Sequence, residues 1–166
     1  MLYDDMLRQA IKYCEIIKPF CQIVKIGGSI RRKSPNPGDI EIVCIPEKYF
    51  LEQYFVEHKI EYHFTKNGGK YKQFNYAGYK IDLFICPLET WAMIYFIRTG
   101  SMEFVRSFMV EFRNRGYKSE DGYLTKIDNG KIVRLREEKD IFRFMGIDFV
   151  LPENRITEYK FKKKVL

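Results

Sequence analysis

The stretch Gly27–Ile45, which reads GGSIRRKSPNPGDIEIVCI, decides the fold of the chain around it. Two glycines, a serine and a pair of arginines come first, and polar and apolar residues alternate from Asp39 onward. Because successive side chains of a strand point to opposite faces, Asp39 and Glu41 are expected to share one face. Glycine turns let backbone N–H groups close on a phosphate, arginine binds its oxygens, and paired carboxylates bind a hard divalent ion such as magnesium. The stretch therefore predicts a phosphate-binding turn next to a metal-binding strand.

The composition indicates a folded, basic protein with a polyanionic partner. The chain has 166 residues, of which 46% are hydrophobic and 16% aromatic, enough to bury the core of one domain or of two small lobes. Its net charge of +7 favours binding to a polyanion. The four cysteines show neither C-x-x-C nor metal-ligand spacing, which predicts reduced thiols in an intracellular protein. Since no apolar run approaches the ~20 residues of a membrane span, we expect a soluble protein.

Residue patterns in the first half of the chain predict helices followed by a sheet. The helices have apolar residues at helical spacing, and the strands are short runs that are β-rich or alternate in polarity. The expected helices cover residues 3–18 and 46–56, and the expected strands cover residues 21–26, 39–45, 61–65, 70–76 and 79–86.

The last three of these strands are expected to form an antiparallel meander, because short glycine turns such as Ala77-Gly78 connect them. The final strand carries one carboxylate, Asp82, among apolar residues. Burying an unpaired charge is costly, so Asp82 is predicted to have a partner.

The second half of the chain predicts a separate, smaller lobe. We therefore expect an α+β fold, with a mixed, mostly antiparallel sheet backed by helices over residues 1–97 and a lobe of helices and strands over residues 98–166. The elements expected in the second half are a helix from Leu88, a break at residues 98–101, a helix over 102–115, a β region over 117–135 and a helix over 137–145.

Motifs along most of the chain resemble the DNA polymerase beta superfamily of nucleotidyltransferases. Three carboxylates on adjacent strands, here Asp39, Glu41 and Asp82, are the signature of that superfamily. The order and spacing of the remaining motifs resemble the family X DNA polymerases within it. These motifs are GSIRR at 28–32, GD at 38–39, TGS at 99–101, EKDIF at 138–142 and LPENR at 151–155.

The resemblance implies a nucleotidyltransferase palm with an N-terminal helix over residues 1–97 and a C-terminal lobe that binds nucleotide and DNA over residues 98–166. It implies that Asp39, Glu41 and Asp82 are catalytic and hold two magnesium ions, for which manganese can substitute. The residues implied for nucleotide binding are Gly28, Ser29, Arg32, Gly38, Thr99, Gly100 and Ser101, and those expected to bind DNA are Lys80, Arg106 and Arg113.

The chain also departs from the pattern of family X. Glu41 stands where the family usually has aspartate, and Ile97-Arg98 replaces an aromatic pair that commonly lies under the sugar of the nucleotide. Only one helix precedes the predicted sheet, so we expect a minimal form that lacks the lyase and helix-hairpin-helix domains of larger members.

The resemblance implies a DNA-directed DNA polymerase that adds a nucleotide from a dNTP to a primer 3′-hydroxyl during gap filling or DNA repair. Its expected partners are a primer–template or gapped DNA and a dNTP, and we expect it to act as a monomer away from membranes. Two alternatives remain open. One is a template-independent nucleotidyltransferase that acts on RNA, a protein or a small molecule, and the other is a catalytically inactive DNA-binding protein.

Overall fold

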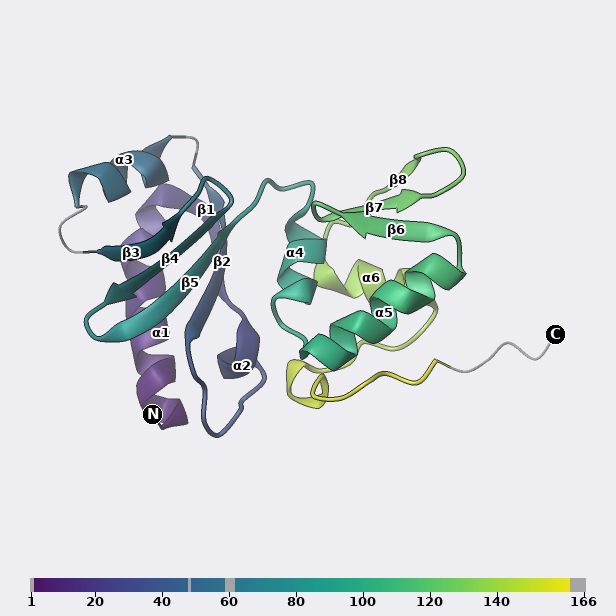
Figure 1. The fold of residues 1–166 in the computed structure, drawn as a ribbon, viewed down its shortest axis with the longest axis horizontal. Helices are drawn as coiled ribbons and strands as arrows, with labels where there is room; N and C mark the ends of the chain where they lie inside the picture. The colour runs from purple at the N-terminus through teal and green to yellow at the C-terminus, as the bar shows by residue number, and fades with distance from the viewer. Residues whose placement is uncertain (1, 48, 59–61, 162–166) are drawn as a thin grey trace. The chain divides into compact units, whose positions relative to one another are not determined.

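A computed structural model describes residues 2–47, 49–58 and 62–161 of the chain. It confirms the predicted α+β class, with a mixed five-stranded sheet and a separate three-stranded sheet. The chain divides into two compact units, Met1–Leu88 and Glu89–Leu166, and each contains one of the sheets (Figure 1). Within the ranges described, no helix has the length and apolar character needed to cross a bilayer.

The strands of the first unit are β1 (Cys21–Ile26), β2 (Ile40–Pro46), β3 (His63–Asn67), β4 (Tyr71–Tyr76) and β5 (Tyr79–Ile85). They follow the order β1-β2-β5-β4-β3 across the sheet. The central pair, β2 and β5, is parallel, and the other pairs are antiparallel. The sheet is therefore mixed and mostly antiparallel, and β3, β4 and β5 form the expected meander. Residue 61, where the first strand of the meander was predicted to begin, lies outside the described residues.

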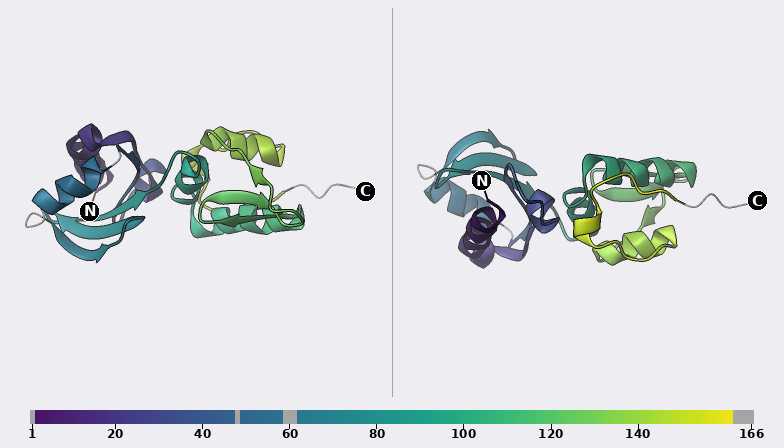
Figure 2. Two further views of the ribbon diagram at one scale, coloured as in Figure 1. Left: turned by 90° about the horizontal axis from the view of Figure 1, so that it is seen from above. Right: turned by 90° about the horizontal axis from the view of Figure 1, so that it is seen from below.

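Helix α1 (Tyr3–Ile17) lies against one face of this sheet (Figure 2). Its buried residues Met6, Ala10, Tyr13 and Ile17 recur at helical spacing and join one core with the sheet. Helix α3 (Phe50–Glu57) adds Leu51, Tyr54 and Phe55 to the same core. The predicted start of this second helix at residue 46 was wrong, because Pro46 still belongs to β2.

The helices cover one face of the sheet, so the polar residues of β2 and β5 lie on the other face. Ile40 and Ile42 of β2 and Ile81 of β5 are buried in the core shared with α1. Glu41 and Asp82 alternate with them along the strands, so their side chains point to the other face of the sheet.

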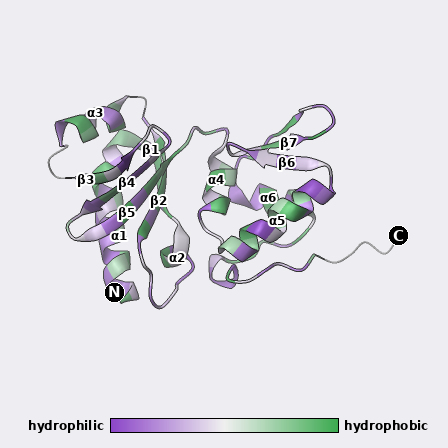
Figure 3. Ribbon diagram, in the orientation of Figure 1, coloured by the Kyte–Doolittle hydropathy of each residue, from purple (hydrophilic) through white to green (hydrophobic). Residues whose placement is uncertain are grey.

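The elements of the second unit are α4 (Trp91–Ile97), α5 (Met102–Asn114), β6 (Tyr117–Glu120), β7 (Tyr123–Lys126), β8 (Ile132–Val133) and α6 (Glu138–Met145). Helices α5 and α6 lie on opposite sides of this unit (Figure 2), and hydrophobic bands alternate with hydrophilic ones along α5 (Figure 3). The apolar face of α5 supplies Phe104, Phe108 and Phe112 to a core that Phe142 of α6 completes. The periodicity of α5 thus accounts for its packing.

The division between the units falls between Leu88 and Glu89, whereas the sequence predicted it at Ile97. Helix α4 belongs to the second unit, because its residues Ala92, Met93 and Phe96 are buried in the same core as Phe104. The break predicted at residues 98–101 is therefore the turn between α4 and α5 inside one unit.

A buried arginine connects two of the C-terminal motifs. The side chain of Arg155 is fully buried, and its Nη1 lies 2.6 Å from Oε1 of Glu138 on α6. Its Nε donates to the carbonyl of Val150 at 2.8 Å, and its own carbonyl accepts a hydrogen bond from the N–H of Ser101 at 2.9 Å. The motifs EKDIF and LPENR therefore meet in an ion pair, and the backbone of Arg155 is hydrogen-bonded to the turn before α5.

Candidate active site

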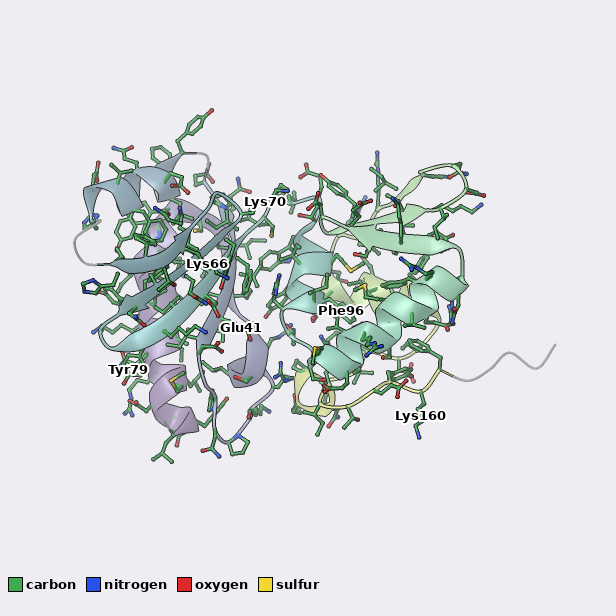
Figure 4. All side chains as sticks on the ribbon, in the orientation of Figure 1. Glu41, Lys66, Lys70, Tyr79, Phe96 and Lys160 are labelled. Carbon is green, nitrogen blue, oxygen red and sulfur yellow. The ribbon has the colours of Figure 1, made fainter. Side chains whose placement is uncertain are left out.

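Two of the three predicted carboxylates are direct neighbours at the centre of the five-stranded sheet. In the register of β2 and β5, Glu41 pairs with Asp82 and Ile40 with Ile81. Asp39 immediately precedes β2, and Figure 4 labels Glu41 on β2, next to the short helix α2 (Gly28–Arg31). The structure therefore places Glu41 and Asp82 on adjacent parallel strands, with Asp39 just before the first of them.

Lys80 places an ammonium group between two of these carboxylates. Its Nζ lies 3.2 Å from Oδ2 of Asp39 and 3.8 Å from Oδ2 of Asp82. The hydrogen bond to Asp39 and the charge of Asp82 raise the pKa of Lys80 above its usual value, so the ammonium is charged at neutral pH. About half of its side chain is exposed, and its stem is flexible, so the ammonium can leave this position without disturbing the core.

The chemistry of these donors suits a hard divalent cation. Magnesium prefers carboxylate oxygens, and Asp39 and Asp82 already bind one cationic group, the Lys80 ammonium. As they are arranged, no three carboxylate, imidazole or thiol groups in the described part of the chain converge on a point that could hold a metal ion. A complete site would need the ammonium to move away and the Glu41 carboxylate to turn toward the other two.

Asp82 has the partners that its burial requires. Its side chain is almost fully buried, and its Oδ1 accepts hydrogen bonds from the hydroxyl of Tyr71 and from Nε2 of Gln73, both at 2.7 Å. Both donors come from β4, the neighbour of β5 on the side away from β2. The sequence predicted that Asp82 needs a partner but did not identify these two residues.

The predicted phosphate-binding turn lies directly beside Glu41. The N–H of Gly27 donates to the carbonyl of Glu41 at 2.8 Å, which extends the pairing of β1 with β2 by one residue. Gly28 follows with a φ of +57°, and the Glu41 side chain covers it so closely that a Cβ at residue 28 would overlap the carboxylate. Glycine suits this position because other residues are strained at this φ and because a Cβ here would force the flexible Glu41 carboxylate to move.

The other residues that were predicted to bind the nucleotide in this unit lie in and after this turn. Ser29 is in α2, and Arg32 ends that helix by donating its N–H to the carbonyl of Gly28 at 3.1 Å. Gly38 is exposed just before Asp39, and a Cβ there would meet no atom within 4 Å. The structure thus gives a steric reason for glycine at residue 28 but none at residue 38.

The predicted turn Thr99-Gly100-Ser101 joins α4 to α5 in the second unit. The buried hydroxyl of Thr99 donates to the carbonyl of Tyr95 at 2.7 Å, and Oγ of Ser101 accepts from the N–H of Phe104 at 3.1 Å as the N-cap of α5. A Cβ at Gly100 would lie 2.8 Å from the side chain of Val105. These residues build the turn itself, and their contact with a nucleotide stays a prediction.

Two predicted DNA-binding residues share a face of α5. Arg106 and Arg113 are both exposed and are separated by about two helical turns. The exposed side chain of Val110 lies between them in the sequence. The face of α5 opposite the phenylalanine core therefore carries two exposed arginines, and their contact with DNA stays a prediction.

Comparison with known protein families finds a similarity in the second unit. Residues 92–156 match the family described as DNA polymerase beta thumb, a segment that begins in α4 and ends just after Arg155. A search of curated proteins found no match to the chain. The thumb match indicates a DNA polymerase-related, DNA-binding protein, and it supports a relationship with the DNA polymerase beta-like proteins of family X.

Proposed function

We propose that the chain is a DNA-directed DNA polymerase of the family X type, which transfers a nucleotidyl group from a dNTP to the 3′-hydroxyl of a primer in gapped DNA. The observation that carries this proposal is the pairing of Glu41 with Asp82 on adjacent strands, with the Gly28 turn beside them. The thumb match of residues 92–156 supports the same function from the second unit. We expect the protein to act as a monomer.

In this proposal the carboxylates of Asp39, Glu41 and Asp82 hold two magnesium ions, and manganese can replace them. When bound, the magnesium supplies positive charge at the attacking and leaving oxygens of an in-line displacement. Lys80, released from Asp39 and Asp82, contacts a primer phosphate, because an ammonium that is attracted to carboxylates is attracted to phosphate in the same way. No protein nucleophile is needed, since phosphoryl transfer depends mainly on positioning and electrostatics.

The remaining residues bind the substrates. The backbone and side chains around the Gly28 turn are proposed to bind the triphosphate, the turn before α5 to contact the sugar, and the exposed arginines of α5 to contact DNA phosphates. The first group is Gly28, Ser29, Arg32 and Gly38, the second is Thr99, Gly100 and Ser101, and the third is Arg106 and Arg113.

A primer–template assay with magnesium, in which each dNTP is supplied singly, tests this proposal. We expect incorporation of the nucleotide that is complementary to the template base. Incorporation of every dNTP regardless of the template would favour the template-independent transferase instead. DNA binding without any incorporation would favour the inactive DNA-binding protein. Repeating the assay with ribonucleotides measures the choice of sugar, which the departure at Ile97-Arg98 leaves open.

A further inference from the structure

We propose that Tyr71 and Gln73 are positioning residues that fix the Asp82 carboxylate so that its Oδ2 atom, and not Oδ1, is offered to a divalent cation. The inference rests on the proposed function, in which Asp82 is a cation ligand. Neither residue belongs to the sequence motifs that predicted the site.

The pairing of β4 with β5 places both residues on the face of the sheet that carries Asp82. Gln73 is the register partner of Asp82, and Tyr71 is the partner of Phe84, two residues further along the same strand. Directly paired side chains of an antiparallel ladder lie on one face and are close enough to interact. The contacts to Asp82 therefore follow from the backbone ladder and do not depend on a loop.

The donor and acceptor of each hydrogen bond among Tyr71, Gln73 and Asp82 can be assigned. Nε2 of Gln73 donates to Oδ1 of Asp82 at 2.7 Å and to the hydroxyl oxygen of Tyr71 at 2.9 Å. Since the Tyr71 hydroxyl accepts from Gln73, its single proton is directed to Oδ1 of Asp82, also at 2.7 Å. Two donors thus converge on Oδ1, and the other oxygen, Oδ2, is the one that faces the Lys80 ammonium at 3.8 Å.

A second layer of contacts holds the two donors in place. The hydroxyl of Thr65 on β3 donates to Oε1 of Gln73 at 2.9 Å, which fixes the amide group of Gln73 toward Asp82. The Tyr71 ring stacks on Phe84 with centroids 5.0 Å apart and planes at 15°, and Nζ of Lys66, labelled in Figure 4, lies 5.3 Å from the Tyr71 centroid. Locked donors of this kind set the direction of a ligating carboxylate before a cation arrives.

The test measures Mn²⁺ binding to the full chain by electron paramagnetic resonance, without DNA or nucleotide, beside single-nucleotide insertion. Tyr71→Phe keeps the ring on Phe84 and removes the donor, and Gln73→Met removes the amide at similar volume. Loss of such outer partners typically weakens metal affinity or activity 10–100-fold. We expect about a tenfold loss of Mn²⁺ affinity for each variant, with a lower kcat and an unchanged KM for dNTP. Thr65→Val, which frees the Gln73 amide, replaces either variant that does not fold.

The control is Tyr79→Phe, which removes a phenol that donates to the carboxylate of Asp5 at 2.8 Å in the same unit. Mn²⁺ affinity and kcat are expected to match the wild type in this variant. The proposal is overturned if the wild type binds no Mn²⁺, or if Tyr71→Phe and Gln73→Met bind it as tightly as Tyr79→Phe does. If the wild type incorporates no nucleotide but the two variants bind Mn²⁺ more weakly than it does, the positioning role is supported and the polymerase is rejected. Failure of the positioning role can therefore be distinguished from failure of the proposed function.

Discussion

Glu41 and Asp82 are direct neighbours on the parallel strands β2 and β5, although α3, β3 and β4 separate them in the sequence. The core fixes the register of this pairing. Ile40 and Ile81, the residues that precede Glu41 and Asp82, are both buried against α1. A shift of either strand by one residue would exchange the buried and exposed faces. The same apolar residues that stabilise the sheet therefore keep the two carboxylates side by side.

The close contact of Glu41 with Gly28 predicts that Gly28→Ala destabilises the protein. A Cβ at residue 28 would overlap the Glu41 carboxylate, and alanine at a φ of +57° adds about 1–2 kcal/mol of strain. We expect the free energy of unfolding in urea to fall by at least that amount. Gly69→Ala is the control, since nothing lies within 4 Å of its Cβ position and its φ is not positive. Equal stability of the two variants would contradict the left-handed backbone conformation of Gly28.

The buried ion pair of the second unit predicts a large effect of Arg155→Met. Removing one partner leaves the Glu138 carboxylate buried without its counter-charge, which typically costs about 3–5 kcal/mol. Urea unfolding measures the loss. In the control, Lys118→Met breaks an exposed pair with Glu120 and should cost at most about 1 kcal/mol. Similar losses for Arg155→Met and Lys118→Met would contradict the structural role given to Arg155.

The N-terminal cap of α6 contains Asp140, and its contribution to the free energy of unfolding is predicted to depend on pH. Burial acts to raise the pKa of Asp140, but hydrogen bonds from the N–H groups of Glu137 and Arg136 and from the Arg143 guanidinium outweigh it and hold the pKa below 3.8, the ordinary value. A carboxyl whose pKa is lowered by folding contributes stability above its unfolded pKa and loses that stability as the pH falls through the folded value.

Asp140→Ala should therefore lower the free energy of unfolding by about 0.5–2 kcal/mol at pH 7, the usual size of a lost cap. Its difference from the wild type should shrink as the pH falls below 3.8. Urea unfolding of both proteins over this pH range checks the prediction, and a difference that is the same at pH 7 and in acid would contradict it.

The exposed arginines of α5 predict DNA binding that depends strongly on salt. Each cation that neutralises a phosphate contributes about 0.9 to the slope of log K against log salt concentration, so Arg106→Gln and Arg113→Gln should each reduce the slope by about 1. Fluorescence anisotropy of labelled gapped DNA over a range of potassium chloride concentrations measures the slope. Lys131→Gln, in the turn before β8, is the control and should leave it unchanged. A nearly flat salt dependence of the wild type would contradict the assigned DNA contacts.

The common face of Asp39 and Glu41 and the meander could be predicted from the residues because they follow from local rules, whereas the adjacency of β2 and β5 was implied only by the family resemblance. Alternation along β2 predicts that Asp39 and Glu41 share a face, and the glycine turns predict the meander. The two-residue turn Ala77-Gly78, with φ values of +51° and +83°, also fixes the register of β4 on β5. Counting back from that turn pairs Gln73 with Asp82, so this turn was the signal that could have identified Gln73.

The remaining features depend on contacts between side chains that are distant in the sequence. No local pattern shows that Lys80 turns toward Asp39, that Glu41 lies over Gly28, or that Arg155 is buried against Glu138. The position of α4 is a similar case, because the polar break after it resembles a linker, whereas its phenylalanine and methionine pack with α5. These arrangements are decided by packing and charge pairing in the folded chain.

Single-nucleotide insertion on gapped DNA with magnesium, compared between the wild type and Asp82→Asn, tests the proposed polymerase most directly. The amide oxygen of asparagine can still accept the hydrogen bonds from Tyr71 and Gln73, so the variant should fold and bind DNA as the wild type does. We predict template-directed insertion by the wild type and a loss of at least about a thousandfold in Asp82→Asn at unchanged DNA affinity, since the carboxylate charge that holds the cation is gone. Insertion by Asp82→Asn at the wild-type rate would contradict the assignment of this carboxylate to the catalytic site.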